Sequence, residues 1–178
     1  MVNELRRWMR LIEAIVPTNG SIVRFNDEEV RVIWDENKNA RNVAKHRGLP
    51  LADGLAVVIN PNSKVEFDYD NRNRDERERY IGSNGDHILV VVVEWFDTGE
   101  ELLNLKLISV RYAEPYEIKQ MMNEDAKPAN AQPETDPDNP PLTGQEKFMP
   151  AGPHVRAKLA AHKAKYAAQQ ADRKDAAE

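Results

Sequence analysis

The stretch ILVVVVEW, residues 88–95, contains the longest apolar run in the sequence. Such a run, bounded by turn-forming residues on both sides, is typical of a central strand whose two faces are both covered. After a turn at 98–101, residues 103–110 begin by alternating leucine with polar side chains, which is the period-two pattern of a strand. We therefore predict that 88–95 and 103–110 pair antiparallel within a sheet.

Further strands are predicted on the N-terminal side of this pair. Residues 21–25 and 30–34 are short apolar segments around an Asn-Asp turn, a pattern that predicts a hairpin. Residues 64–69 alternate apolar and charged side chains, and another strand begins at 79–81. Together with the helices below, these segments predict an α+β fold built on a small antiparallel sheet.

Four segments among the first 122 residues have the composition or spacing of helices. Residues 36–46 hold strong helix formers, follow Asp35 as an N-cap, and end in basic residues that suit the negative C-terminal dipole. Residues 4–16 are amphipathic, and 51–59 have one apolar face between two prolines. Residues 115–122 are predicted to close the domain as a short helix.

The last third of the chain differs in composition. Residues 123–153 are rich in Pro, Asn and acidic residues and contain few hydrophobes, so they cannot bury enough apolar area to offset chain entropy. The predicted organisation is an N-terminal helix and strand extension at 1–30, a domain at 31–124, a disordered linker at 125–154 and a helical tail at 155–178.

The bulk composition limits the chemistry. With no cysteine among 178 residues, disulfides, thiolate metal sites and cysteine nucleophiles are excluded. We recognise no metal-ligand spacing and expect no cofactor. The apolar run is too short to cross a membrane and no signal peptide begins the chain, so a cytoplasmic protein is expected. A net charge of −5 argues against a surface broadly coated by nucleic acid.

The start of the domain carries a distinctive series of polar residues. In order they are Trp34, Asp35, Lys38, Asn42, Lys45, His46 and Gly48. This series resembles the opening of the BrnT family of bacterial toxins, where a strand ending in Trp-Asp leads into a helix ending in Lys-His-Gly. Arg47 departs from the pattern because it stands between the histidine and the glycine.

Later blocks follow in the family's order. They are Glu78-Arg79-Tyr80 with Ile81-Gly82, the valine-rich strand, and Ile108-Ser109-Val110-Arg111 with Ala113 and Glu117. The resemblance covers roughly half of the chain and depends on the order of the blocks. The stretch at 79–82 is shorter than the usual pattern, and Trp95 and Lys106 stand where the family often has arginine.

This resemblance implies a RelE-like fold and a ribonuclease that cleaves RNA without a metal. It also implies growth inhibition until a BrnA-type ribbon-helix-helix antitoxin binds, in a two-plus-two assembly. Attack of a ribose 2′-hydroxyl on the next phosphate needs a base, a cation for the phosphate oxygens and a proton for the leaving oxygen. We predict His46, Arg79 and Arg111 as the catalytic residues, with His46 transferring protons and the arginines compensating charge. The predicted RNA-binding lysines are Lys38, Lys45 and Lys106.

Each of these residues also has a structural interpretation. His46 suits a helix C-terminus, and Arg111 can pair with Glu117. Lys38 and Asn42 are more often solvated helix positions, although their spacing also allows them to face a phosphate. A catalytically inactive binding module that keeps the toxin fold is therefore the alternative function. Trp34 and Trp95 are predicted to be core or interface anchors. The arginines Arg72, Arg74 and Arg77 are predicted to lie in a self-neutralising loop at 70–78.

A second resemblance lies in the predicted linker. Residues 136–143, with the sequence DPDNPPLT, precede Met149-Pro150-Ala151. This arrangement is similar to the linker of BrnA-type antitoxins, in which an Asp-Pro-rich stretch precedes an Arg-Pro-Ala motif. It suggests a toxin domain fused to a fragment of its antitoxin, without the ribbon-helix-helix part.

Overall fold

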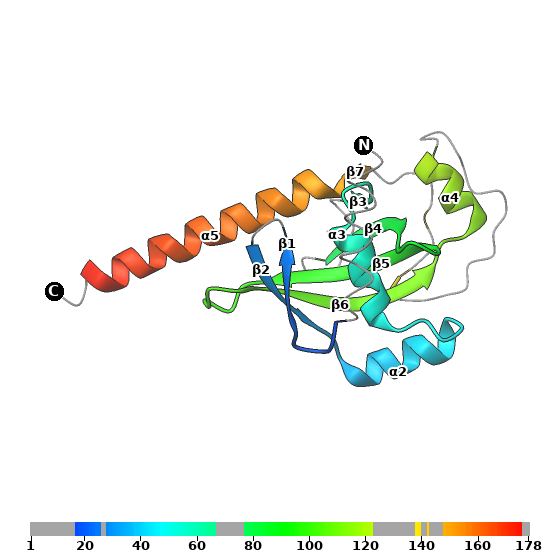
Figure 1. Cartoon of the computed structure of the whole chain (residues 1–178), viewed down its shortest axis with the longest axis horizontal. Coiled ribbons are helices and arrows are strands. Elements are labelled where there is room, and N and C mark those ends of the chain that lie inside the picture. The colour runs from blue at the N-terminus through cyan, green and yellow to red at the C-terminus, as the bar shows by residue number, and fades with distance from the viewer. Residues whose placement is uncertain are drawn as a thin grey trace.

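The computed structural model describes residues 17–25, 28–66, 77–122, 138–139, 142 and 148–175. These residues form an α+β fold around one seven-stranded sheet (Figure 1). The predicted helix at 4–16, the end of the predicted strand at 67–69 and most of the predicted loop lie outside the described residues.

The strand order in the sheet is β1-β2-β6-β5-β4-β3-β7. Its strands are β1 (Ile22–Phe25), β2 (Glu28–Ile33), β3 (Lys64–Glu66), β4 (Arg77–Ser83), β5 (Ile88–Phe96), β6 (Leu103–Tyr112) and β7 (Phe148–Pro150). The described helices are α2 (Glu36–Lys45), α3 (Gly54–Ile59), α4 (Pro115–Met122) and α5 (Ala151–Asp175), with a 3-10 turn at Leu51–Asp53.

The predicted centre of the sheet is confirmed. β5 pairs antiparallel with β6 on one side and with β4 on the other. Its four consecutive valines, Val90 to Val93, are completely buried, as expected for a strand covered on both faces. The hairpin of β1 and β2 is confirmed as well.

The sheet is mixed, so the prediction of an antiparallel sheet is wrong at one pair. β2 lies parallel to β6, from Val30 opposite Leu103 to Ile33 opposite Lys106. Between these strands the chain passes through α2, α3 and β3 to β5, which is long enough to return it to the end from which β2 started. Local alternation predicts a strand but carries no information on the direction of a distant neighbour.

The two faces of the sheet have different covers. We call the face that carries Val91 and Trp95 the front face, and the face that carries Val90 and Arg111 the back face, because successive side chains alternate across a strand. The main core lies on the front face, under α3 and the first turns of α5. A smaller apolar cluster on the back face joins Ile81, Val90 and Leu142 to side chains of α4.

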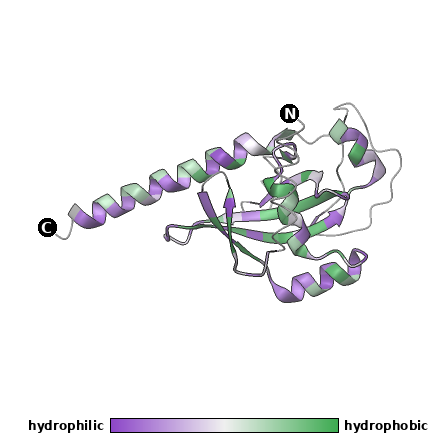
Figure 2. Ribbon diagram, viewed as in Figure 1, coloured by the Kyte–Doolittle hydropathy of each residue, from purple (hydrophilic) through white to green (hydrophobic). Residues whose placement is uncertain are grey.

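The C-terminal segment belongs to the fold where the structure describes it. Most of the predicted linker at 125–154 lies outside the described residues, but Phe148–Pro150 near its end forms β7, which pairs antiparallel with β3. α5 begins at Ala151, earlier than predicted, and buries Ala151, Val155 and Leu159 in the main core. Its second half projects away from the sheet (Figure 1), and hydrophilic residues alternate there with weakly hydrophobic ones (Figure 2).

Candidate nucleic-acid interface

Asn42 joins α2 to the edge of the sheet. Beyond Ile33, where β2 ends, the outer backbone groups of β6 have no strand partner in the register of this pair. The Asn42 side chain takes that place, since its Oδ1 accepts from Val110 N at 3.2 Å and its Nδ2 donates to Val110 O at 2.7 Å. The same amide donates to Leu49 O at 2.9 Å. Asn42 is therefore buried, and the prediction of a solvated or phosphate-facing position is wrong for it.

His46 lies at the C-cap of α2, as its structural interpretation proposed. It is buried, and its backbone N–H donates to Asn42 O. The helix then ends through Arg47 and Gly48, which have φ angles of 53° and 86°, and Gly48 N donates to Val43 O at 2.9 Å. The additional Arg47 is thus accommodated by a left-handed backbone, a conformation that costs about 1 kcal/mol for a residue with a Cβ.

Arg79 is neutralised within the sheet. It stands directly opposite Glu66 on the neighbouring strand β3. Its Nε donates to Glu66 Oε2 at 2.8 Å, and its Nη2 lies 2.6 Å from the same oxygen. With only 4% of the Arg79 side chain exposed, this pair is part of the packed back face.

Arg111 forms a bidentate pair with Glu117 of α4, as its structural interpretation proposed. Both Nη–Oε distances are 2.7 Å, and Glu117 is completely buried. The Glu117 carboxylate also accepts from the backbone N–H groups of Glu114 and Leu142. The pair therefore ties β6, α4 and the segment near Leu142 together.

Three basic side chains define a cationic cluster on the back face: Lys38, Arg77 and Lys106. Arg77, Glu94 and Lys106 stand opposite one another across β4, β5 and β6, and Lys106 Nζ lies 3.6 Å from Glu94 Oε2. Lys38 Nζ and Arg77 Nη1 each contact one carboxylate oxygen of Asp138, both at 3.3 Å. Two cations from α2 and β4 thus converge on a single anion.

The cluster contains two of the predicted RNA-binding lysines and one residue that was missed. Arg77 was assigned to a self-neutralising loop, but it is the first residue of β4. Because side chains alternate along a strand, Arg77 lies on the same face of the sheet as Arg79, two positions later. If the predicted strand at 79–81 had been extended by two residues toward the N-terminus, this alternation would have identified Arg77. Lys45 is exposed in the last turn of α2, about 10 Å along the helix axis from Lys38.

The front face carries a different polar group, which anchors α5. Glu78 Oε1 contacts His154 Nε2 at 2.8 Å and Lys158 Nζ at 2.7 Å, while Tyr80 OH donates to Glu78 Oε2. Lys158 Nζ also lies 5.9 Å from the centre of the Trp95 ring. Burial alone would raise the pKa of Glu78, but the hydrogen bond from His154 and the charge of Lys158 outweigh it and lower the pKa. Burial raises the pKa of Tyr80, and so does the Glu78 carboxylate.

Because of this lowered pKa, the contact of Glu78 with α5 should weaken in acid. The ionised carboxylate stabilises the fold above its ordinary pKa of 4.5, and that contribution is lost as the pH falls through the lower folded value. We expect that the free energy of unfolding of Glu78→Gln falls less steeply than that of the wild type between about pH 6 and about pH 3. Urea unfolding at each pH measures this free energy. Glu114→Gln at an exposed site is the control, and parallel curves for wild type and Glu78→Gln would contradict this prediction.

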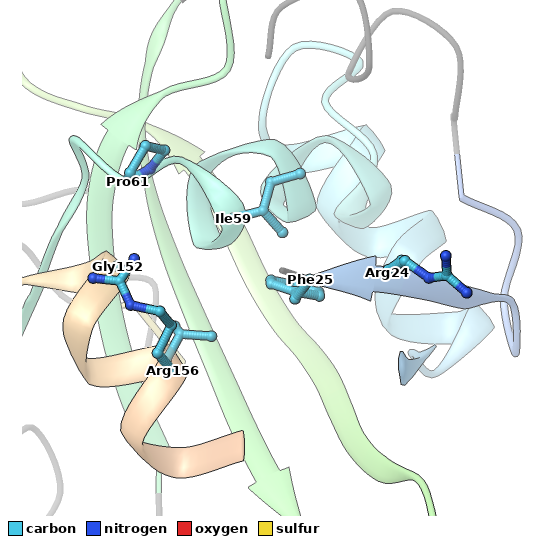
Figure 3. Close-up of a pocket in the computed structure, with 7 residues that line it drawn as sticks. Arg24, Phe25, Ile59, Pro61, Gly152 and Arg156 are labelled. Atoms are coloured by element: carbon cyan, nitrogen blue, oxygen red, sulfur yellow. The ribbon is translucent and has the colours of Figure 1, made fainter. Parts of the chain in front are cut away.

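A small pocket between β1, α3 and α5 is a weaker candidate for an anion site. Figure 3 shows that the guanidinium groups of Arg24 and Arg156 lie on opposite sides of it. Arg24 also pairs with Glu29 at 3.4 Å. The pocket does not bring two cations to one point, as the cationic cluster does. It is lined by Arg24, Phe25, Ile59, Pro61, Gly152, Val155 and Arg156.

Comparison with known proteins identifies a family to which part of the chain is similar. No helix in the described part of the chain is both long and apolar enough to cross a membrane, and no curated protein matches the sequence. Residues 34–117 match the family model described as the ribonuclease toxin BrnT of type II toxin-antitoxin systems. The match begins at the end of β2, runs through the cationic cluster and ends at Glu117. Over this segment, which is slightly less than half of its length, the chain is similar to the BrnT family of ribonuclease toxins.

Proposed function

We propose that the protein is a toxin that cleaves RNA by attack of a ribose 2′-hydroxyl, without a metal, and that a BrnA-type antitoxin neutralises it. The match to this family supports an RNA target and an antitoxin partner. We further propose that it acts in the cytoplasm as a RelE-like ribonuclease and arrests growth when no antitoxin is bound, and that the complex holds two copies of each protein.

The convergence of Lys38 and Arg77 on one carboxylate carries this proposal. A phosphodiester, like a carboxylate, presents one negative charge shared over two oxygens, and a planar guanidinium matches that geometry. Lys106 lies on the same face, in the row opposite Arg77 and Glu94. A local cluster of this kind provides phosphate binding on a chain whose net charge is −5.

The roles proposed for the remaining residues follow the reaction. Arg79 and Arg111 compensate the charge that develops on the phosphate, and His46 transfers a proton. Lys45 extends the RNA contact along α2. Because both arginines are now held by carboxylates, binding at Lys38 and Arg77 comes first, and the phosphate then competes with Glu66 and Glu117.

One observation favours the alternative of a binding module without catalysis. Arg79 and Arg111 are buried, and each is neutralised by a carboxylate at 2.6–2.7 Å. Such pairs stabilise a fold without reaching a substrate. In that case the cationic cluster would bind RNA or an acidic protein surface without any cleavage of the bound molecule.

The test is RNA cleavage in the presence of EDTA by the full chain, both as wild type and with Asp138→Ala, which removes the carboxylate at Lys38 and Arg77. Adding Lys38→Ala and Arg77→Ala together should reduce cleavage by about tenfold, since partly exposed ion pairs contribute about 0–1 kcal/mol each and about 1.4 kcal/mol corresponds to a factor of ten. Lys174→Ala with Arg173→Ala removes the same charge from the exposed end of α5 and is the matched control. RNA that is bound but stays intact with every chain would favour the binding module.

A further inference from the structure

We propose that the segment around Asp138 is a built-in occupant of the RNA surface, in which the chain's own carboxylate takes the position of an RNA phosphate and lowers the affinity of the toxin domain for RNA. This inference rests on the proposed function, because it assigns the cationic cluster as the place where RNA binds. The described residues of this occupant are Asp138, Asn139 and Leu142.

The contacts of Asp138 are those of a phosphate analogue. Its Oδ2 accepts from Lys38 and its Oδ1 from Arg77, so each oxygen of the anion meets one cation from a different element. The carboxylate is 36% exposed, and Lys38 and Arg77 are 30% and 21% exposed. Ion pairs with this exposure contribute little to stability, about 0–1 kcal/mol each, so an RNA phosphate can displace the carboxylate without unfolding the domain.

Asn139 fixes the position of this carboxylate. It is completely buried on the back face. Its backbone O accepts from Arg111 Nε at 3.0 Å, and its Nδ2 donates to Val90 O at 2.9 Å. The residue next to Asp138 is therefore held by one of the predicted catalytic arginines and by the central strand, which places the segment over the proposed site.

Leu142 provides a second anchor. Its side chain is 2% exposed and packs with Ile81 and Val90, and its backbone N–H donates to Glu117 Oε1 at 2.9 Å. The weak contacts of Asp138 thus lie beside strong anchors. Since β7 and α5 also attach the following residues to the sheet, the carboxylate stays at a high effective concentration near its site.

The experiment compares RNA binding and RNA cleavage by the full chain carrying Asp138→Ala, Asp138→Asn or the control Asp172→Ala. Asp172 is exposed near the end of α5, so its replacement makes the same charge change away from the site. The binding probe is a labelled single-stranded RNA with 2′-O-methyl groups at every position, which cannot be cleaved by 2′-hydroxyl attack. Unmodified RNA of the same sequence reports cleavage, and thermal unfolding shows that each variant is folded.

Removing the carboxylate should tighten binding of the methylated RNA by about tenfold. The reason is that Asp138 no longer competes with the RNA for Lys38 and Arg77, so a larger fraction of the protein is able to bind. Asp138→Asn keeps the shape, loses the charge and should tighten binding in the same direction. Asp172→Ala should change the affinity by less than about twofold, as expected for a distant surface charge. Equal affinities for the Asp138 and Asp172 variants would overturn the inference.

Cleavage separates this inference from the function on which it rests. Tighter binding together with faster cleavage by the Asp138 variants supports both. Tighter binding without cleavage by any chain would support the occupant and overturn the ribonuclease. Equal cleavage by the wild type and the Asp138 variants would support the ribonuclease and overturn the occupant.

Discussion

Replacing Glu117 with alanine is expected to lower the free energy of unfolding by about 3–5 kcal/mol, the effect of leaving a buried charge without its partner. Arg111 is 9% exposed and makes two 2.7 Å contacts with this carboxylate. The same substitution removes an acceptor from the backbone N–H groups of Glu114 and Leu142. The loss should therefore loosen α4 and the segment over the back face together.

Urea unfolding of the full chain measures this effect, with Glu114→Ala as an exposed control one turn away that should cost less than about 1 kcal/mol. A second variant, Glu117→Leu with Arg111→Met, removes both charges and should recover part of the stability, because an apolar pair replaces the buried ion pair while the N–H groups of Glu114 and Leu142 still lack their acceptor. A loss for Glu117→Ala no larger than that of the control would contradict a structural role for the pair.

The second large effect is expected for Asn42→Ala, which should cost about 3 kcal/mol or more. Its side chain makes three buried hydrogen bonds to backbone groups of Val110 and Leu49, and each unsatisfied buried group costs about 1–3 kcal/mol. Alanine is the better helix former, so the loss must come from these contacts. Hydrogen exchange at the Val110 amide should become faster in the variant.

Asn37→Ala is the matched control, since Asn37 is exposed on the same helix. It should leave stability unchanged or raise it slightly through helix propensity. An Asn42→Ala variant as stable as Asn37→Ala would show that water or a shifted α2 replaces the side chain at Val110. In that case Asn42 would not be the partner that completes the edge of β6.

Much of the fold could be predicted because the signals were local. The apolar run at 88–95 gave β5, alternation gave β6, and α4 has the predicted bounds, Pro115–Met122. Asp35 is the N-cap of α2 and accepts from Lys38 N at 2.7 Å, as its residue type indicated. These patterns depend only on side chains within one or two turns of each other.

The remaining features depend on residues that are far apart in the chain. β7 was missed because its strand has three residues and its stability comes from β3, more than 80 positions earlier. Asn139 is polar and lies in a Pro-rich stretch, so nothing in its neighbourhood indicates that Val90 and Arg111 bury it. For the candidate site, residue type predicted Lys38 and Lys106, whereas the convergence of Lys38 with Arg77 depends on the packing of α2 against β6.

The pairing of β7 with β3 has a consequence for any shortened form of the protein. β3 has β4 on one side and β7 on the other, from Lys64 opposite Pro150 to Glu66 opposite Phe148. A fragment that ends at Met122 would leave the outer backbone donors and acceptors of β3 exposed, and it would uncover the apolar surface beneath Val155 and Leu159. An open sheet edge beside bare apolar surface is a template onto which a second chain adds its own strand. The C-terminal segment therefore covers backbone groups and apolar surface that a shortened chain would present to other chains.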